Sequence, residues 1–389
     1  MKKITMKSIM FFAAASLLTF GFSGSALAFH DGGVAHCDGC HTMHNSIDGA
    51  QVTATIGGSL TKGSDASSTC MTCHNAASGN SYHVSSADGS SFKAGGDFYW
   101  LTKTFTWTAH GTAASSKGEN HGHNIVAADF AGFTSPDLTL TTAPGGTYNS
   151  TYLGCNSCHD PHGKKNGGTK MGGAAIEGSG SYGVTGPTRG SYRLLAGTGY
   201  VTDSVTFTAA SPIAASPGNV ADTDAAHVAY GQGMSEWCGN CHGGFANVGN
   251  LHPAGNTQTL GSGSIYQNYN SYVKTGLFTG TSATSYLELV PFERQVTDGT
   301  ALLAGTTSTA GPNASSNVMC LTCHRAHASA FENSARWDFT TEFIADSHPV
   351  ATDGGVSGND VLNSYQGRDM IAQFGAYQRS LCNKCHVQD

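Results

Sequence analysis

Apolar and polar residues alternate along this chain with few stretches of the 3.6-residue period that marks long amphipathic helices. Glycine, serine, threonine and asparagine interrupt the apolar positions every few residues, which is typical of turns and irregular chain. Short helices are expected to start at several of the cysteine motifs described below, and residues 204–209 are expected to form a brief strand. The pattern therefore predicts a mostly irregular coil with short helices and few strands.

The first 28 residues have the features of a cleaved signal peptide. Three lysines come first, residues 9–20 are apolar, and Ala26-Leu27-Ala28 is a small-residue cleavage site. The apolar run is shorter than the roughly 20 residues that a membrane span needs, and no second such run follows, so no membrane span is expected. We expect an exported protein whose residues 29–389 form a single domain.

Composition changes the expected picture of the core. Among 389 residues, 52 are glycine, 12% are charged and 39% are hydrophobic, which is a low apolar content for a chain of this length. Without the three lysines of the leader, 16 of the 19 basic residues stand against 26 acidic ones, a net charge of −10. Such a surface repels polyanions, so nucleic acid is not expected as a partner.

The cysteines all belong to one repeated motif. The 12 cysteines form six copies of C-x-x-C-H, and none is left over. In this signature two thiols form thioethers with a haem and the next histidine binds the iron as its proximal ligand. Zinc ribbons do not require a histidine after every C-x-x-C pair, and disulfide frameworks use varied spacings. The sequence predicts six covalently attached haems c, numbered in chain order and held by Cys37, Cys40, His41, Cys70, Cys73, His74, Cys155, Cys158, His159, Cys238, Cys241, His242, Cys320, Cys323, His324, Cys382, Cys385 and His386.

Six haems would supply the core that the side chains lack. The chain after the leader offers about sixty residues for each haem, so every large apolar macrocycle can be wrapped by a modest length of chain. Covalent anchors and iron ligation replace much of the packing that the low apolar content cannot supply. The expected fold is therefore a multihaem cytochrome in which irregular chain wraps around the haems.

Twelve histidines lie outside the motifs, enough for a second axial ligand on each of six irons. His44, His162 and His327 each follow a proximal histidine by three residues, a spacing that points two side chains to similar sides of a helical turn. The second imidazole cannot reach the same iron, but it can reach a neighbouring one, which favours haems in close pairs. Alternatively, these histidines lie at the surface or at a haem edge. Met43 is the one methionine suitably placed for ligation, and the supply of histidines favours two histidines per iron.

Eight blocks of sequence carry a resemblance to a known family. They run in order from residue 29 to the C-terminus and are FHDGGVAHCDGCHTMHNS, GHNIVAADF, TLTTAPGGTY, CNSCHDPHGK, VAYGQGMSEWCGNCH, LHPAGN, NVMCLTCHRAHASAF and AYQRSLCNKCH. On these blocks the chain resembles the OmcS-like family of filament-forming extracellular hexahaem cytochromes, although the loops differ around 175–225 and 335–375. The resemblance implies a continuous stacked haem array in which every iron has two histidine ligands.

The resemblance also implies which histidines are the distal ligands. A histidine at the CHTMH position of one subunit ligates a haem of the next subunit, which assigns His44 to the fifth haem of a neighbouring copy. The other candidates in matching blocks are His30, His83, His123, His162, His252 and His327. These are seven candidates for six places, with His30 or His83 as the surplus one. The histidines without a counterpart are expected to be exposed or locally bonded, and they are His36, His110, His121, His227 and His348.

These inferences point to an electron-transfer protein rather than an enzyme. A head-to-tail contact that does not close on itself would build a homopolymeric filament, extracellular or at the cell surface. Its partners would be other c-type cytochromes and extracellular acceptors such as ferric oxides. A discrete periplasmic carrier is the first alternative. A multihaem reductase is the second, but it needs an iron with an exchangeable position, often marked by a departure such as C-x-x-C-K, and all six motifs end in histidine.

Overall fold

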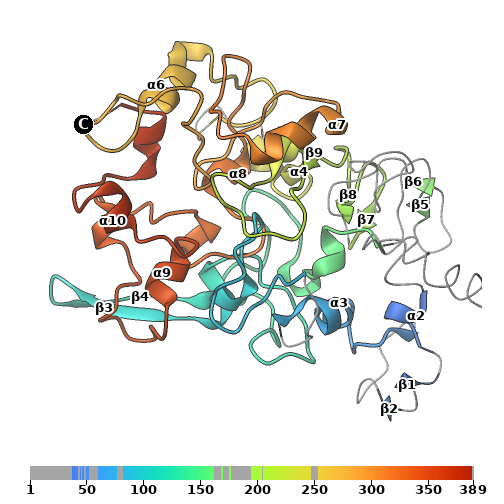
Figure 1. Ribbon diagram of the computed structural model, residues 1–389. Helices are drawn as coiled ribbons and strands as arrows, with labels where there is room; N and C mark the ends of the chain where they lie inside the picture. Colours follow the sequence, from blue (N-terminus) through green and yellow to red (C-terminus); the bar gives the residue numbers. More distant parts are fainter. Residues whose placement is uncertain are drawn as a thin grey trace, which may run out of the picture.

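A computed structural model provides the fold, and it has the predicted character of irregular chain with short helices and few strands (Figure 1). Every sheet among the described residues has two strands, and no helix in this part of the chain is long and apolar enough to cross a membrane. The described residues are 37–42, 44, 46–47, 50–51, 60–76, 82–161, 168–169, 175–176, 194–203, 205–246 and 253–387.

The helices of this part of the chain are nearly all one or two turns long. The α-helices are α2 (Cys37–Cys40), α3 (Ala66–His74), α4 (Met234–Cys238), α5 (Gly243–Ala246), α6 (Ile265–Ser271), α7 (Gly299–Leu302), α8 (Cys320–Cys323), α9 (Asp360–Ser364) and α10 (Met370–Phe374). The 3₁₀ turns are η3 (Phe98–Thr102), η4 (Gly118–Asn120), η5 (Ser150–Tyr152), η6 (Cys155–Ser157), η8 (Ser262–Ser264), η9 (Leu303–Thr307), η10 (Glu332–Ser334), η11 (Ile344–Asp346) and η12 (Leu381–Lys384).

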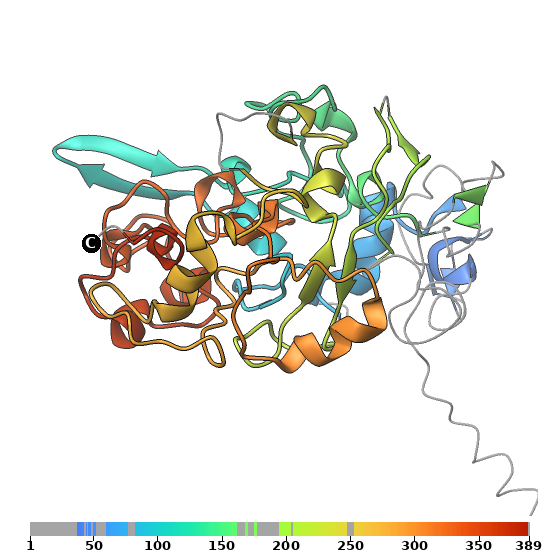
Figure 2. The ribbon, with the colours of Figure 1, turned by 90° about the horizontal axis from the view of Figure 1, so that it is seen from above.

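The strands form antiparallel pairs. Their bounds are β1 (Ser46–Ile47) with β2 (Ala50–Gln51), β3 (Phe105–Ala109) with β4 (Thr112–Ser116), β5 (Gly168–Thr169) with β6 (Ala175–Ile176), β7 (Val201–Thr202) with β8 (Val205–Thr206), and β9 (Ile213–Ala215) with β10 (Ala229–Gln232). The β3–β4 hairpin projects from the molecule in both views (Figures 1 and 2). The strand predicted over 204–209 is present only as β8, and Ser204 lies outside the described residues.

The prediction that short helices start at several of the cysteine motifs is confirmed at three of them, while a helical turn lies at or beside the other three. α2, η6 and α8 begin at the first cysteine of their motifs, whereas α3 carries its motif at its C-terminal end and α4 ends at the first cysteine of its own. Asp65 shows why α3 begins where it does, because its carboxylate accepts a hydrogen bond from the Ser68 N–H at 2.7 Å and caps the helix. The helix α2 and the C-terminus lie at opposite ends of the molecule (Figures 1 and 2).

Buried apolar side chains form separate clusters rather than one continuous core. The largest surrounds Trp337 and Tyr269, a second surrounds Phe105, and a third contains Tyr230 and Met319. Motif cysteines pack at the edges of these clusters, namely Cys323 and Cys385 in the first, Cys155 in the second and Cys238 in the third. The protein's apolar side chains are therefore arranged around the motif sulfurs.

Besides these clusters, the structure buries a group of ionised side chains. The Glu288 carboxylate is fully buried and bonds the guanidinium groups of Arg325 and Arg336 at 2.8 and 3.2 Å. Asp222 is buried nearby. Its burial, followed by the charge of Glu288, raises its pKa to about 7, although Arg336 and Arg325 act in the opposite direction.

The raised pKa of Asp222 predicts a pH dependence of stability. The folded protein holds the Asp222 proton up to about pH 7, whereas the unfolded chain releases it near pH 3.8. The stabilisation is therefore complete below about pH 4 and is lost as the pH rises through 7. We expect Asp222→Asn to lose less free energy of unfolding than the wild type between pH 5 and pH 8 in denaturant titrations followed by circular dichroism. Equal losses in the two proteins would contradict this assignment.

Candidate haem sites

Consecutive cysteine motifs pack against each other in pairs. The thiols of Cys70 and Cys155 lie close enough to shift each other's pKa, which is raised at Cys70 and lowered at Cys155, so the second motif is next to the third. The thiols of Cys238 and Cys320 influence each other in the same way, so the fourth motif is next to the fifth. Two haems attached at such neighbouring sulfurs would have adjacent edges.

The same backbone contact occurs in both pairs. The N–H of Cys155 donates to Ser67 Oγ at 3.1 Å, and the N–H of Cys320 donates to Ser235 Oγ at 3.0 Å. Each serine stands three residues before the first cysteine of the preceding motif. Sequence reasoning missed these residues, and the recurring S-x-x-C spacing in the second and fourth motifs is the signal that could have found them.

The pairs are themselves connected in chain order. Burial raises the pKa of the Cys158 thiol to about 12, and the nearby Cys241 adds to the shift. Burial also raises the pKa of Cys323 to about 12, with a further contribution from Cys382. Because charges influence each other in this way only over short distances, the third motif lies near the fourth and the fifth lies near the sixth. No disulfide joins the cysteines whose side chains the structure describes.

Several motif histidines are oriented by backbone carbonyl groups. The Nδ1–H groups of His74, His242 and His324 donate to carbonyl oxygens of Tyr82, Pro144 and Asn333 at 2.7, 2.8 and 2.9 Å. A carbonyl oxygen only accepts, so this bond fixes the tautomer and leaves the Nε2 lone pair available. Histidines that bind metals are usually held in this way. The bond thus sets the tautomer of the three rings, with the hydrogen on Nδ1 and the lone pair on Nε2, as ligation through Nε2 requires.

Two distal candidates lie near motif histidines, with ring separations that suit a shared metal. The ring centres of His123 and His242 are 6.0 Å apart, and those of His159 and His327 are 6.4 Å apart. With metal–nitrogen bonds of about 2 Å, two imidazoles on opposite sides of one ion have ring centres about 6 Å apart. His123 Nδ1–H also donates to Ala326 O at 2.7 Å. The residues present therefore fit haem irons with two histidine ligands.

Of the other distal candidates, the structure describes His44 and His83. His44 is exposed, next to α2. His83 has a buried Nε2 without a hydrogen-bond partner in the part of the chain that the structure describes, which leaves this nitrogen available for a metal. The described residues include all six proximal histidines, which are His41, His74, His159, His242, His324 and His386. His30, His36, Met43, His162, His252 and the side chain of Cys37 lie outside the described residues.

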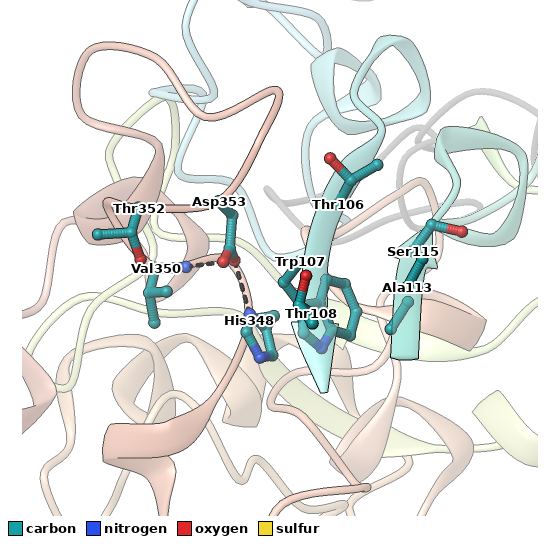
Figure 3. A pocket seen from close by; sticks show the side chains of 10 residues that line it. Thr106, Trp107, Thr108, Ala113, Ser115, His348, Val350, Thr352 and Asp353 are labelled. Carbon is teal, nitrogen blue, oxygen red and sulfur yellow. Dashed lines mark hydrogen bonds and ion pairs between the residues drawn. The ribbon is translucent and has the colours of Figure 1, made fainter. Parts of the chain in front are cut away.

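Four histidines without a counterpart in the family occupy local environments. His121 is buried with both ring nitrogens bonded, to Trp100 O at 2.9 Å and to Ser116 Oγ at 2.8 Å. His227 stacks on Tyr286, and His110 is exposed in the β3–β4 turn. His348 stacks on Trp107 and bonds Asp353 at 2.6 Å, beside an open groove of about 700 Å³ (Figure 3). No cysteine motif lines this groove.

Six C-x-x-C-H motifs, of which the second touches the third and the fourth touches the fifth, together with paired imidazoles about 6 Å apart at two of them, define a multihaem c-type cytochrome. The chain is 43% identical, over 440 aligned residues that cover 100% of both proteins, to C-type cytochrome OmcS of Geobacter sulfurreducens. It therefore belongs to the OmcS family, which confirms the predicted resemblance, and its haem is covalently bound.

Solved structures of the same family are similar to this one. The outer membrane cytochrome S filament from Geobacter sulfurreducens matches with a TM-score of 0.79 and 42% identity, covering 93% of this chain and 100% of that one. A cryo-EM structure of OmcS nanowires from the same organism matches with a TM-score of 0.76, 43% identity and the same coverage. No family model matches the chain.

The neighbouring histidines His123 and His242 allow a direct test of whether both bind the same iron. We expect His123→Ala to leave the iron at His242 with one imidazole, so that one ferric haem becomes high-spin and binds cyanide. His121→Gln is the matched control, because a glutamine amide can still donate to Trp100 O and accept from Ser116 Oγ. Optical and electron paramagnetic resonance (EPR) spectra measure both variants. A fully low-spin His123→Ala protein would contradict the pairing.

Proposed function

We propose that this protein transfers electrons outside the cell through six haems, each with two histidine ligands, in subunits that polymerise into conductive filaments. The observation that carries the proposal is the contact between consecutive motifs, through Cys155 N–H and Ser67 Oγ for the second and third and through Cys320 N–H and Ser235 Oγ for the fourth and fifth. Haems at adjacent motifs would be near enough for electrons to pass between them without a diffusing carrier. Residues 29–389 form the single haem-binding domain after removal of a signal peptide.

The proposed ligands follow from the motifs and the ring positions together. His159 with His327 and His242 with His123 bind the third and fourth irons, a proposal supported by the separations of their rings. The buried, unbonded Nε2 of His83 supports a ligand role for this residue and makes His30 the surplus candidate. His162 and His252 are the remaining distal ligands within the subunit.

The protein's contribution to electron transfer is to hold ligands still. Haem iron supplies the redox chemistry when bound, cycling between ferric and ferrous states. Carbonyl groups of Tyr82, Pro144, Asn333 and Ala326 fix the orientation of four imidazoles. Two fixed ligands leave an iron without an open position, so the coordination changes little when an electron arrives. This arrangement favours transfer over substrate chemistry.

Two features support assembly head to tail. The exposed His44 follows α2 at one end of the molecule, and the C-terminus lies at the other end (Figures 1 and 2). The similar structures are a filament and nanowires of OmcS. In our proposal His44 binds the fifth haem of the adjacent subunit, so that one residue completes a haem site and joins the polymer. Other c-type cytochromes deliver electrons, and extracellular acceptors such as ferric oxides receive them.

Replacement of His44 tests the proposed joint. We expect His44→Ala to retain six covalently attached haems by mass spectrometry, since its own motif is intact. One iron should lack its distal ligand, and electron microscopy of the secreted fraction should show single subunits instead of filaments. His110→Asn, at another exposed histidine, is expected to form filaments normally.

Two results would contradict the proposal. Filaments of His44→Ala with six low-spin irons would show that His44 is not the ligand that joins subunits. Uniform single subunits of the wild-type protein in the secreted fraction would favour a discrete periplasmic carrier instead.

A further inference from the structure

The buried Glu288 group touches the fifth haem motif directly. Arg336 Nε–H donates to Leu321 O at 2.6 Å and to His324 O at 3.2 Å, while the Arg336 backbone N–H donates to Cys323 O at 2.8 Å. Three carbonyl groups of the C-x-x-C-H turn are therefore bound by one residue. The Nε–H is shared by two carbonyl groups, and Nη1 of the same planar guanidinium donates to Glu288 O at 3.0 Å and Oε1 at 3.2 Å, so the rigid group ties the turn to Glu288.

The same group reaches the segment that holds His327. Arg325 Nη1 donates to Ala94 O at 3.3 Å. The next residue, Gly95, accepts the His327 N–H at 2.7 Å, and a Cβ atom at Gly95 would lie 3.0 Å from His327 Nδ1. Arg325 thus supports the backbone on which the His327 ring rests.

Glu288 connects the two arginines and keeps its charge. Its Oε1 bonds Arg325 Nη2 at 2.8 Å and Arg336 Nη1 at 3.2 Å, and all three side chains are buried. Burial opposes ionisation, but the two guanidinium charges hold the pKa of Glu288 below its usual value. Arg368 pairs with Asp224 at 2.9 Å and reaches Glu288 Oε2 at 3.7 Å, and the other ionisable groups near Glu288 include Asp222, Tyr230 and Tyr286.

We propose that Glu288, Arg325 and Arg336 form a positioning cluster that fixes His324 relative to His327 and sets the reduction potential of the fifth haem through its charge. The inference rests on the proposed function, in which His324 binds the fifth iron and His327 the third. In this role the cluster would align two haems of the electron path.

The sign of the charge effect follows from electrostatics. A reduced iron carries one positive charge less than an oxidised one, so a nearby positive charge favours reduction and raises the potential. Interactions are weakly screened in a buried site. Loss of the Glu288 charge should therefore raise the potential of the fifth haem, and loss of the Arg336 charge should lower it. If the two substitutions only disturbed the local structure, the shifts in reduction potential would not be expected to have opposite signs.

The experiment compares Glu288→Gln, Arg336→Met and a control in the full-length haem-loaded protein. The control is Asp360→Asn, which breaks another buried ion pair, to Lys103 at 2.7 Å. Spectroelectrochemical titration should shift one of the six components upward in Glu288→Gln and downward in Arg336→Met. Asp360→Asn should leave all six unchanged. Shifts of one sign in both variants, or none beyond the control, would overturn the proposal.

Arg336→Lys separates the effect of the charge on the potential from the effect of the guanidinium on the position of the turn. It also provides a test if Arg336→Met fails to fold. Lysine keeps the charge but lacks the fork, so we expect an unchanged potential together with altered low-spin EPR signals from one haem. Unaltered EPR signals would overturn the positioning role. Mass spectrometry and spin state are measured on each preparation. Six low-spin haems with unshifted potentials would refute this inference alone, whereas fewer haems in the wild type would refute the proposed function.

Discussion

The contact between one haem-binding turn and the next is the constraint on which the rest of this structure depends. The Oγ atoms of Ser67 and Ser235 each accept a hydrogen bond from the backbone N–H of the first cysteine in the following motif. One C-x-x-C-H turn is therefore bonded directly to the next in these two pairs. Short helices and two-stranded sheets could not position these turns by themselves, since they bury little surface. The apolar clusters around Trp337, Phe105 and Tyr230 each pack against one or more motif cysteines. The chain is organised around its attachment points.

Ionised side chains have an unusual place in such a chain. Only 12% of the residues are charged, yet Glu288, Arg325 and Arg336 are buried together. Buried ion pairs seldom add stability over apolar packing, so their presence calls for another role. Their hydrogen bonds go to the carbonyl groups of Leu321, His324 and Ala94, next to candidate iron ligands. Precise ligand placement and local charge are both properties that an electron path requires.

The local features of the fold and sites could be predicted from the sequence, and the long-range ones could not. Each C-x-x-C-H motif predicts covalent haem attachment and a proximal iron ligand from five consecutive residues. The scarcity of periodic apolar stretches predicts irregular chain. The pairing of His123 with His242, and of His327 with His159, joins segments far apart in sequence. Irregular chain has no regular period from which the spatial distance between two distant histidines can be predicted. The distal ligands could therefore be selected only from the resemblance to the OmcS family. The serine contacts and the Glu288 cluster likewise depend on segments that only the folded chain brings together.

A cryo-EM map of the native secreted assembly tests the central claim most directly, because porphyrins and axial ligands are visible in it. We expect six porphyrins per subunit, adjacent in the order of their motifs, with irons between His159 and His327 and between His123 and His242. We also expect density from His44 to the fifth haem of the next subunit. Haems separated by chain, or ordered differently from the motifs, would contradict the central claim.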